Sequence, residues 1–285
     1  MGGHLSGLDA FREALSAGER LDLARACLLV AQDAYPSLDV ERYVGELDAL
    51  GERLRQRLKN QTVEERVAGL NEFLFGDLGY RGNTDDYYDP RNSYLNEVME
   101  RKTGIPITLS IIYMEVGRRI GLPLQGVSFP GHFLVRLRLH GGMLVLDPFA
   151  GGAPQSEDEL RERLQRVIPE GAAPGVSVAE LPLDQFLEPA SGRQILARLL
   201  RNLKGIYREA DKPERLVAVL DRMLVISPDA PAELRERGYA YQRLECWRPA
   251  LADLTAYLER EPEAADLDEV RAALAELALR CARLN

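Results

Sequence analysis

The spacing of apolar residues changes at Gly121, and this change limits the folds open to the chain. Before it, residues 106–120 carry apolar side chains on almost every face of a predicted helix, which is typical of a helix at the centre of a domain. After it, apolar residues form three short predicted strands, over residues 124–129, 133–139 and 143–146. We therefore expect an α+β core in which a small antiparallel sheet packs on one central helix.

Predicted helices precede and follow this core. Residues 8–75 place apolar side chains three and four apart, which indicates a run of amphipathic helices. Residues 77–92 follow without any period and contain three Tyr, four Asp and two Gly. A segment of this kind is either a functional loop or a packed surface loop, and both remain open. A charged helix is predicted over residues 157–167, between breaks rich in Gly and Pro at 150–154 and 170–175.

The chain beyond residue 191 is helical in pattern and repeats at a fixed interval. A tyrosine, a leucine and a proline each recur 34 residues later, in the pairs Tyr207/Tyr241, Leu220/Leu254 and Pro228/Pro262. That interval is the tetratricopeptide period, so we expect two repeats and a capping helix. The predicted organisation is a set of N-terminal helices packing on the core (residues 1–76), the core itself (77–190) and an all-α repeat tail (191–285).

Charge and cysteine content exclude several classes of protein. The 285 residues include 36 Lys and Arg against 45 Asp and Glu, a formal net charge of −9. Such a chain is poorly suited to binding nucleic acid phosphates or anionic lipid, and no apolar run approaches the roughly 20 residues that span a bilayer. The three cysteines are far apart and predict neither a disulfide framework nor a zinc site. We expect a cytoplasmic protein without cofactor or metal, and a protein or peptide as its partner.

His132 is the histidine most suited to a functional role, because it follows a Pro-Gly turn at the mouth of a predicted strand. Asp147 lies fifteen residues later, at the far end of the neighbouring strand. If the hairpin closes around residues 139–140, the two side chains face each other across the ladder. If it closes on residues 141–142, they are four residues out of register and form no pair. The sequence leaves both registers open.

Three segments, in this order, resemble a known family. They read YYDPRNSYLNEVMERKTGIPITLS, FPGHFLVRL and LDPFAGG, and a tetratricopeptide pair follows them. The chain is similar in these segments to the SirB-type family of bacterial proteins, which has a transglutaminase-like core. The resemblance extends over nearly the whole chain from about residue 40. It implies a papain-type fold that presents a Cys-His-Asp triad, with His132 and Asp147 as two of its members, and a regulatory role or an unknown one.

The implied triad lacks its nucleophile in this sequence. In active members of the wider superfamily a Cys occupies the first turn of the central helix, where the helix N-terminus stabilises the thiolate. Here that turn, residues 106–110, reads Pro-Ile-Thr-Leu-Ser. Thr108, or else Ser110, could attack a substrate only with His132 as general base and Asp147 as its orienting acid. The alternative for both hydroxyls is helix capping or bonding to helix carbonyls.

Four more residues complete the candidate site. Asn92 and Asn96 stand shortly before the central helix, where either could serve as an oxyanion donor or simply as a cap and a core-edge amide. Tyr87 and Tyr88 could wall a cleft, or they could cover the core as part of an ordered loop.

Three hypotheses for function follow. The favoured one is a non-catalytic adaptor that holds a protein segment through its cleft and its helical repeats. The alternative is a hydrolase or acyl transferase for amides or esters, with a triad of Thr108 or Ser110, His132 and Asp147. The third is a structural subunit with an inert cleft.

Overall fold

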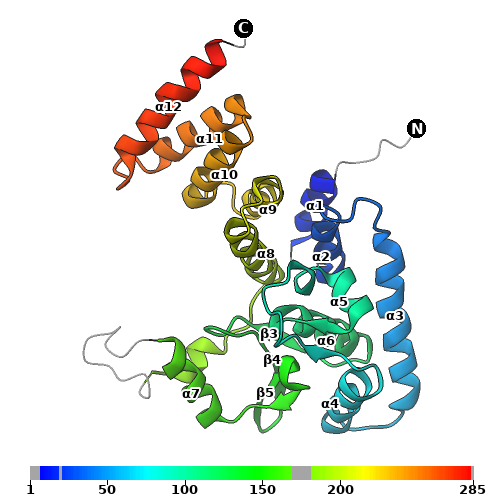
Figure 1. Ribbon diagram of the computed structural model, residues 1–285. Helices are drawn as coiled ribbons and strands as arrows, with labels where there is room; N and C mark the ends of the chain where they lie inside the picture. The colour runs from blue at the N-terminus through cyan, green and yellow to red at the C-terminus, as the bar shows by residue number, and fades with distance from the viewer. Residues whose placement is uncertain (1–6, 19–20, 169–180, 284–285) are drawn as a thin grey trace. The chain divides into compact units, whose positions relative to one another are not determined.

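The computed structural model describes residues 7–18, 21–168 and 181–283, which fall into two compact units (Figure 1). The unit that we call the core unit contains residues 18–31 and 37–199. The other, the repeat unit, contains the residues up to 17, residues 32–36 and the chain from residue 200 onward. The predicted break at residues 170–175 lies outside the described residues.

The core unit is built around α6 (Pro106–Arg119), and every residue of this helix from Pro106 to Gly117 is buried. The predicted central helix is thus confirmed. In Figure 1, α3 runs along one side of this unit. The other helices of the core unit are α2 (Leu23–Ala31), α3 (Val40–Arg57), α4 (Val63–Asn71) with its π-helical extension η2 (Glu72–Asp77), α5 (Leu95–Arg101) and α7 (Glu157–Val167).

Local chemistry sets where several of these helices begin. Asp39 caps α3 by accepting a hydrogen bond from the backbone N–H of Arg42. Thr62 caps α4 reciprocally, because its hydroxyl accepts from Glu65 N at 3.2 Å while the Glu65 carboxylate accepts from Thr62 N at 2.8 Å. Pro106 occupies the first turn of α6, where a missing N–H costs no helical hydrogen bond.

The predicted antiparallel sheet is present and has one strand more than expected. Its order is β3-β4-β5-β6, all neighbours being antiparallel. One face packs on α7 and the segment around Leu187 through a cluster of buried apolar side chains. A separate pair of two-residue strands, β1 (Arg81–Gly82) and β2 (Thr103–Gly104), is parallel. The strands of the sheet are β3 (Gln125–Val127), β4 (Leu134–Leu139), β5 (Gly142–Asp147) and β6 (Ala153–Pro154).

From residue 200 onward, the described part of the repeat unit consists of helices joined by short turns, as the 34-residue interval predicts. Helix α8 (Gly192–Glu209) starts in the core unit and ends in this one. Hydrophobic packing joins the helices that follow, with Leu224, Leu234 and Leu254 among its buried residues. These helices are α9 (Pro213–Ile226), α10 (Pro231–Arg243), α11 (Trp247–Arg260) and α12 (Leu267–Ala282).

Helix α1 (Gly7–Ser16) also belongs to the repeat unit, where it packs on α9. The buried Arg222 of α9 holds it there. The guanidinium of Arg222 pairs with Asp33, with Nη2 at 2.7 Å from Oδ1, and lies 4.9 Å from the centroid of the Phe11 ring. Over the described ranges, none of the helices has the length and apolar character that crossing a bilayer requires.

Candidate functional site

His132 and Asp147 are hydrogen-bonded: Nε2 of His132 lies 3.0 Å from Oδ1 of Asp147. The register that produces this contact is neither of the two left open by the sequence. Leu139 pairs with Gly142, so the hairpin turns on residues 140–141, and Asp147 stands two residues away from direct opposition to His132. The contact is diagonal, which is within reach because His132 lies in the turn before β4 and outside the ladder.

The Asp147 carboxylate is almost wholly buried and has three partners. Oδ1 accepts from His132 and from the backbone N–H of Phe149 at 3.0 Å, while Oδ2 accepts from Nη2 of Arg163 at 2.8 Å. Burial alone would raise the pKa of Asp147, but the His132 hydrogen bond, the nearby positive charge and the Phe149 N–H outweigh it and lower this pKa below its ordinary value. Asp147 is therefore ionised at neutral pH and fixes the ring of His132.

The backbone that carries His132 is held by Arg198 of α8. One guanidinium donates to Ser128 Oγ at 2.8 Å, to Phe129 O at 2.9 Å and to His132 O at 2.7 Å. The amide of His132 closes the same turn on Phe129 O at 3.1 Å, with Gly131 at a φ of +66°. Arg198 thereby positions the main chain of His132, as Arg163 positions its acidic partner.

The ring of Phe149 forms the apolar neighbour of His132. The two ring centroids are 6.0 Å apart, with an angle of 82° between the planes. On its other side Phe149 lies edge-on to Tyr87 at 6.3 Å, and it approaches Gly82 so closely that a Cβ there would stand 2.5 Å from Cε2 of the ring. The side chain of His132 is 14% exposed, so its ring borders solvent beside an aromatic surface.

Thr108 does not present its hydroxyl to His132. Oγ1 of Thr108 accepts from Ile105 N at 3.1 Å and lies 2.8 Å from Asn92 O, to which it can donate its one proton. The side chain is fully buried, and no hydrogen bond joins it to His132 within the described part of the chain. The geometry is that of a cap that fastens the start of α6 to the preceding loop.

The three remaining polar candidates are buried. Asn92 anchors the 77–92 loop, since its Nδ2 donates to Asp86 O at 2.7 Å and to Tyr87 O at 3.3 Å. Asn96 Oδ1 and Ser110 Oγ are enclosed, and neither has a hydrogen-bond partner among the described residues. By contrast Tyr87 and Tyr88 are exposed, and Tyr87 lies beside Phe149, the aromatic neighbour of His132.

Comparison with known proteins shows the family of the chain. A family model described as the transglutaminase-like superfamily matches residues 41–201, and a tetratricopeptide repeat model matches residues 203–275. The chain belongs to the transglutaminase-like superfamily. The predicted fold class and both parts of the resemblance are thereby confirmed.

Named relatives extend the assignment over most of the chain. A UPF0162 protein of Xylella fastidiosa is 46% identical over 260 residues, 91% of either chain. A UPF0162 protein of Vibrio cholerae is 28% identical over 86% of this chain and 88% of that one. Protein SirB1 of Salmonella typhimurium is 29% identical over 75% of this chain and 77% of that one. The chain is thus a UPF0162 protein of the SirB type within the transglutaminase-like superfamily.

The two residues that the sequence predicts as the His and Asp of a triad, His132 and Asp147, are hydrogen-bonded, and the first turn of α6 carries no thiol. Among the cysteines, Cys27 of α2 is buried, and burial raises the pKa of its thiol. Cys246 and Cys281 belong to the repeat unit.

Sequence reasoning did not find Arg163, Arg198 or Phe149. Arg163 is one of several charged residues on α7, and Arg198 one of several on α8, so nothing in their local pattern separates them from solvated positions. Phe149 lies in the LDPF segment that carried the resemblance, but its contacts come from the loop at Gly82 and Tyr87, far away in the sequence.

Proposed function

We propose that this chain is a non-catalytic member of the transglutaminase-like superfamily, a pseudoenzyme that binds a segment of a partner protein and acts as an adaptor. The observation that carries the proposal is the state of Thr108. A nucleophile needs a lone pair that the substrate can reach and a proton within reach of its base. The Thr108 hydroxyl is enclosed, accepts from Ile105 N and has Asn92 O as the acceptor for its proton.

The surface beside His132 supports a binding role. Tyr87 and Tyr88 are 41% and 71% exposed, and Tyr87 lies against Phe149, which in turn contacts His132. Tyrosine is enriched at protein interfaces, because it offers a large apolar ring and a hydroxyl at small cost in conformational entropy. The tetratricopeptide helices add a second element of a kind that commonly binds proteins.

A photo-crosslinking experiment on the full chain tests the proposal. Tyr88 is replaced by p-benzoylphenylalanine, and the matched control carries the same residue at Val63, which is exposed on α4. The adaptor role predicts a defined partner adduct from position 88 that is absent from position 63 and is suppressed by excess wild-type chain. Identical adducts from both positions, or none from position 88, would contradict it.

A hydrolase or acyl transferase is the second candidate, and the His132–Asp147 hydrogen bond favours it. Such an enzyme would have to release Thr108 from its cap before attack. Hydrolysis of 4-nitrophenyl esters by the wild-type chain, lost in both Thr108→Val and His132→Gln, would support this candidate. Equal rates for the three chains and for buffer would remove it.

A further inference from the structure

The exposed tyrosines stand on a loop that is held in place, not on a frayed one. Asn92 bonds to the backbone oxygens of Asp86 and Tyr87, and Asn83 Nδ2 donates to Asn92 Oδ1 at 3.0 Å. The backbone N–H of Asn83 is bonded in turn to Gly104 O at 2.9 Å. Since its main chain is tied down on both sides, the loop offers the rings of Tyr87 and Tyr88 as a preformed surface. Preorganisation of this kind lowers the entropic cost of binding.

The rings of Tyr87 and Tyr88 are nearly perpendicular to each other. Their centroids are 5.4 Å apart and their planes meet at 77°. Tyr88 is the more exposed of the two, because Tyr87 is partly covered by Phe149. The exposed face of the Tyr88 ring can therefore stack with a planar group from solvent.

Elsewhere in this protein, aromatic faces are covered by arginines of the same chain. Examples are Arg42 over Tyr43 at 5.0 Å, Arg235 over Tyr239 at 5.1 Å and Arg280 over Trp247 at 4.6 Å. Within the described residues, no Arg or Lys lies over the ring of Tyr88 in this way. The most exposed aromatic side chain of the described residues, Tyr88, therefore lacks the cationic partner that several other aromatic rings of the chain have.

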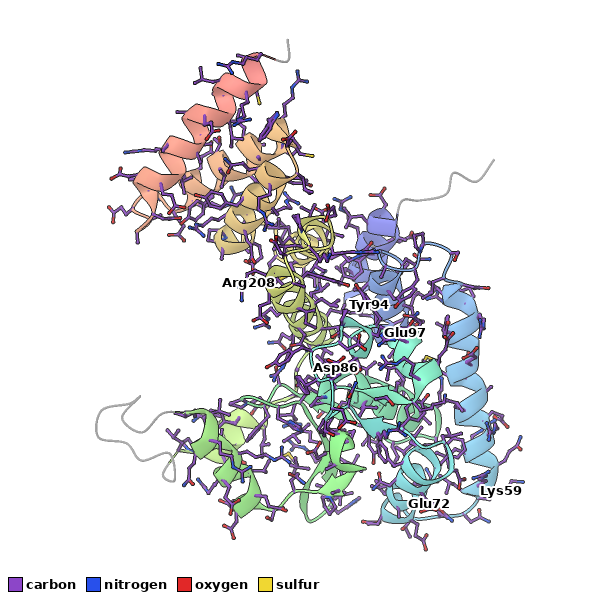
Figure 2. All side chains as sticks on the ribbon, viewed as in Figure 1. Lys59, Glu72, Asp86, Tyr94, Glu97 and Arg208 are labelled. Atoms are coloured by element: carbon purple, nitrogen blue, oxygen red, sulfur yellow. The ribbon has the colours of Figure 1, made fainter. Side chains whose placement is uncertain are left out.

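The charge next to this face is also unbalanced. Asp85 and Asp86 (Asp86 is labelled in Figure 2) are exposed and directly precede the tyrosines, and neither forms an ion pair with another described residue. Asp89, on the other side of the tyrosines, differs: it is buried and its carboxylate pairs with Arg91 at 2.7 Å. The carboxylate of Asp89 is thus neutralised within the loop, whereas those of Asp85 and Asp86 lie exposed next to the ring of Tyr88 and the partly covered ring of Tyr87.

We propose that this surface, Asp85–Tyr88, binds an arginine side chain of the partner segment. A guanidinium is planar, stacks on aromatic rings and pairs with carboxylates through its fork of N–H donors, so it satisfies both features of the surface together. This inference rests on the proposed adaptor function, and it specifies that the bound partner segment contains an arginine. His132 and Phe149 border the same surface, which places the remainder of the segment next to them.

The test compares two pools of fluorescent five-residue peptides with random flanks, one with arginine at the centre and one with citrulline, its neutral isostere. Fluorescence anisotropy with the full chain measures both affinities. We expect the arginine pool to bind about tenfold more tightly than the citrulline pool. Tyr88→Ser and the double variant Asp85→Asn/Asp86→Asn should each weaken arginine binding by about fivefold or more.

The matched control is Glu64→Gln/Asp158→Asn, which removes two exposed acidic charges elsewhere and should leave binding unchanged. Equal affinity for the two pools, no binding of the arginine pool, or binding that Tyr88→Ser does not alter would overturn the arginine assignment. If the crosslink from position 88 persists in any of those cases, the adaptor proposal is retained and only the assignment of arginine as the bound side chain is rejected. A concentration-dependent dimer of the chain alone that Tyr88→Ser abolishes would assign the surface to a second copy instead.

Discussion

Two buried carboxylates, one in each unit, are held by different partners. In the repeat unit, Asp253 accepts from Nε and Nη2 of Arg237 at 2.7 Å each, and the same guanidinium reaches Asp221 at 2.6 Å. In the core unit, Asp147 is shared between Arg163 and the ring of His132. One network consists of arginine and aspartate alone, whereas the other includes an imidazole that borders solvent.

The difference separates an architectural network from one able to serve a site. Arginine keeps its charge at every working pH, so the Arg237 cluster can only join α9, α10 and α11. Asp147 instead orients a ring whose second nitrogen makes no hydrogen bond to the described residues and which borders solvent. The His132–Asp147 pair is therefore where we expect ligand effects, and the Arg237 cluster is where we expect the greater loss of stability on mutation.

The largest effect is expected for Arg237→Ala. This change leaves two carboxylates without their cation in a largely buried setting, which costs about 3–5 kcal/mol in comparable networks. Hydrogen exchange of α10 and α11, together with urea unfolding, measures the loss. Arg271→Ala, at an exposed position of α12, is the control and should stay within about 0.5 kcal/mol of wild type. A similarly small loss of stability for Arg237→Ala would contradict the structural role that we assign to the Arg237 cluster.

Asp147→Asn should have an intermediate effect. It weakens hydrogen bonds from one charged and one imidazole donor and leaves Arg163 without a counter-charge, for a loss of about 2–3 kcal/mol. Urea unfolding measures it, with the exposed Asp158→Asn as the matched charge control. A loss for Asp147→Asn no greater than that of the control would show that the pair does not order the hairpin.

The same pair predicts a pH dependence. Because folding lowers the pKa of Asp147, its carboxylate contributes stability that is fully present above the unfolded value of about 3.9 and disappears as the pH falls through the folded value. Unfolding free energies of wild type and Asp147→Asn should therefore converge below about pH 4. A difference that widens as the pH falls would mean that the pKa is raised instead.

The smallest effect on stability is expected for Arg198→Ala. Ser128 is exposed, and the buried Phe129 O keeps the His132 N–H as a donor, so we expect a loss of about 1–2 kcal/mol. Exchange of the His132 amide should nevertheless accelerate, because the turn that protects it loses its support, and Arg198→Lys should restore part of this protection. Arg138→Ala, at an exposed position of β4, serves as control. Unchanged exchange in Arg198→Ala would remove its positioning role.

The spacing of apolar residues predicted most of the fold, because a helix or strand that buries one face shows a regular apolar spacing in its own segment of the sequence. The central helix, the hairpin strands, α7 and the 34-residue repeat were all visible in this way. The register of the hairpin was not, since the choice of residues 140–141 as the turn depends on how the sheet packs. The domain boundaries at residues 76 and 190 and the cytoplasmic location stay predictions.

The candidate site was only partly predictable. His132 and Asp147 could be named from the turn and strand that carry them, and they are in contact. Whether Thr108 attacks or caps depended on Asn92 O, sixteen residues away in the sequence, and Arg198 reaches His132 O from sixty-six residues away. Such contacts depend on tertiary structure and leave no periodic signal.

Labelling of the intact chain with oxygen-nucleophile probes, a fluorophosphonate and a β-lactone, tests most directly whether the Thr108 hydroxyl is a cap. Peptide mass mapping then reports any adduct on residues 106–110. If the Thr108 hydroxyl acts only as a helix cap, no adduct forms at Thr108 or Ser110 in the wild-type chain or in His132→Ala. An adduct at Thr108 in wild type that disappears in His132→Ala would show a working nucleophile and base, and would contradict the account.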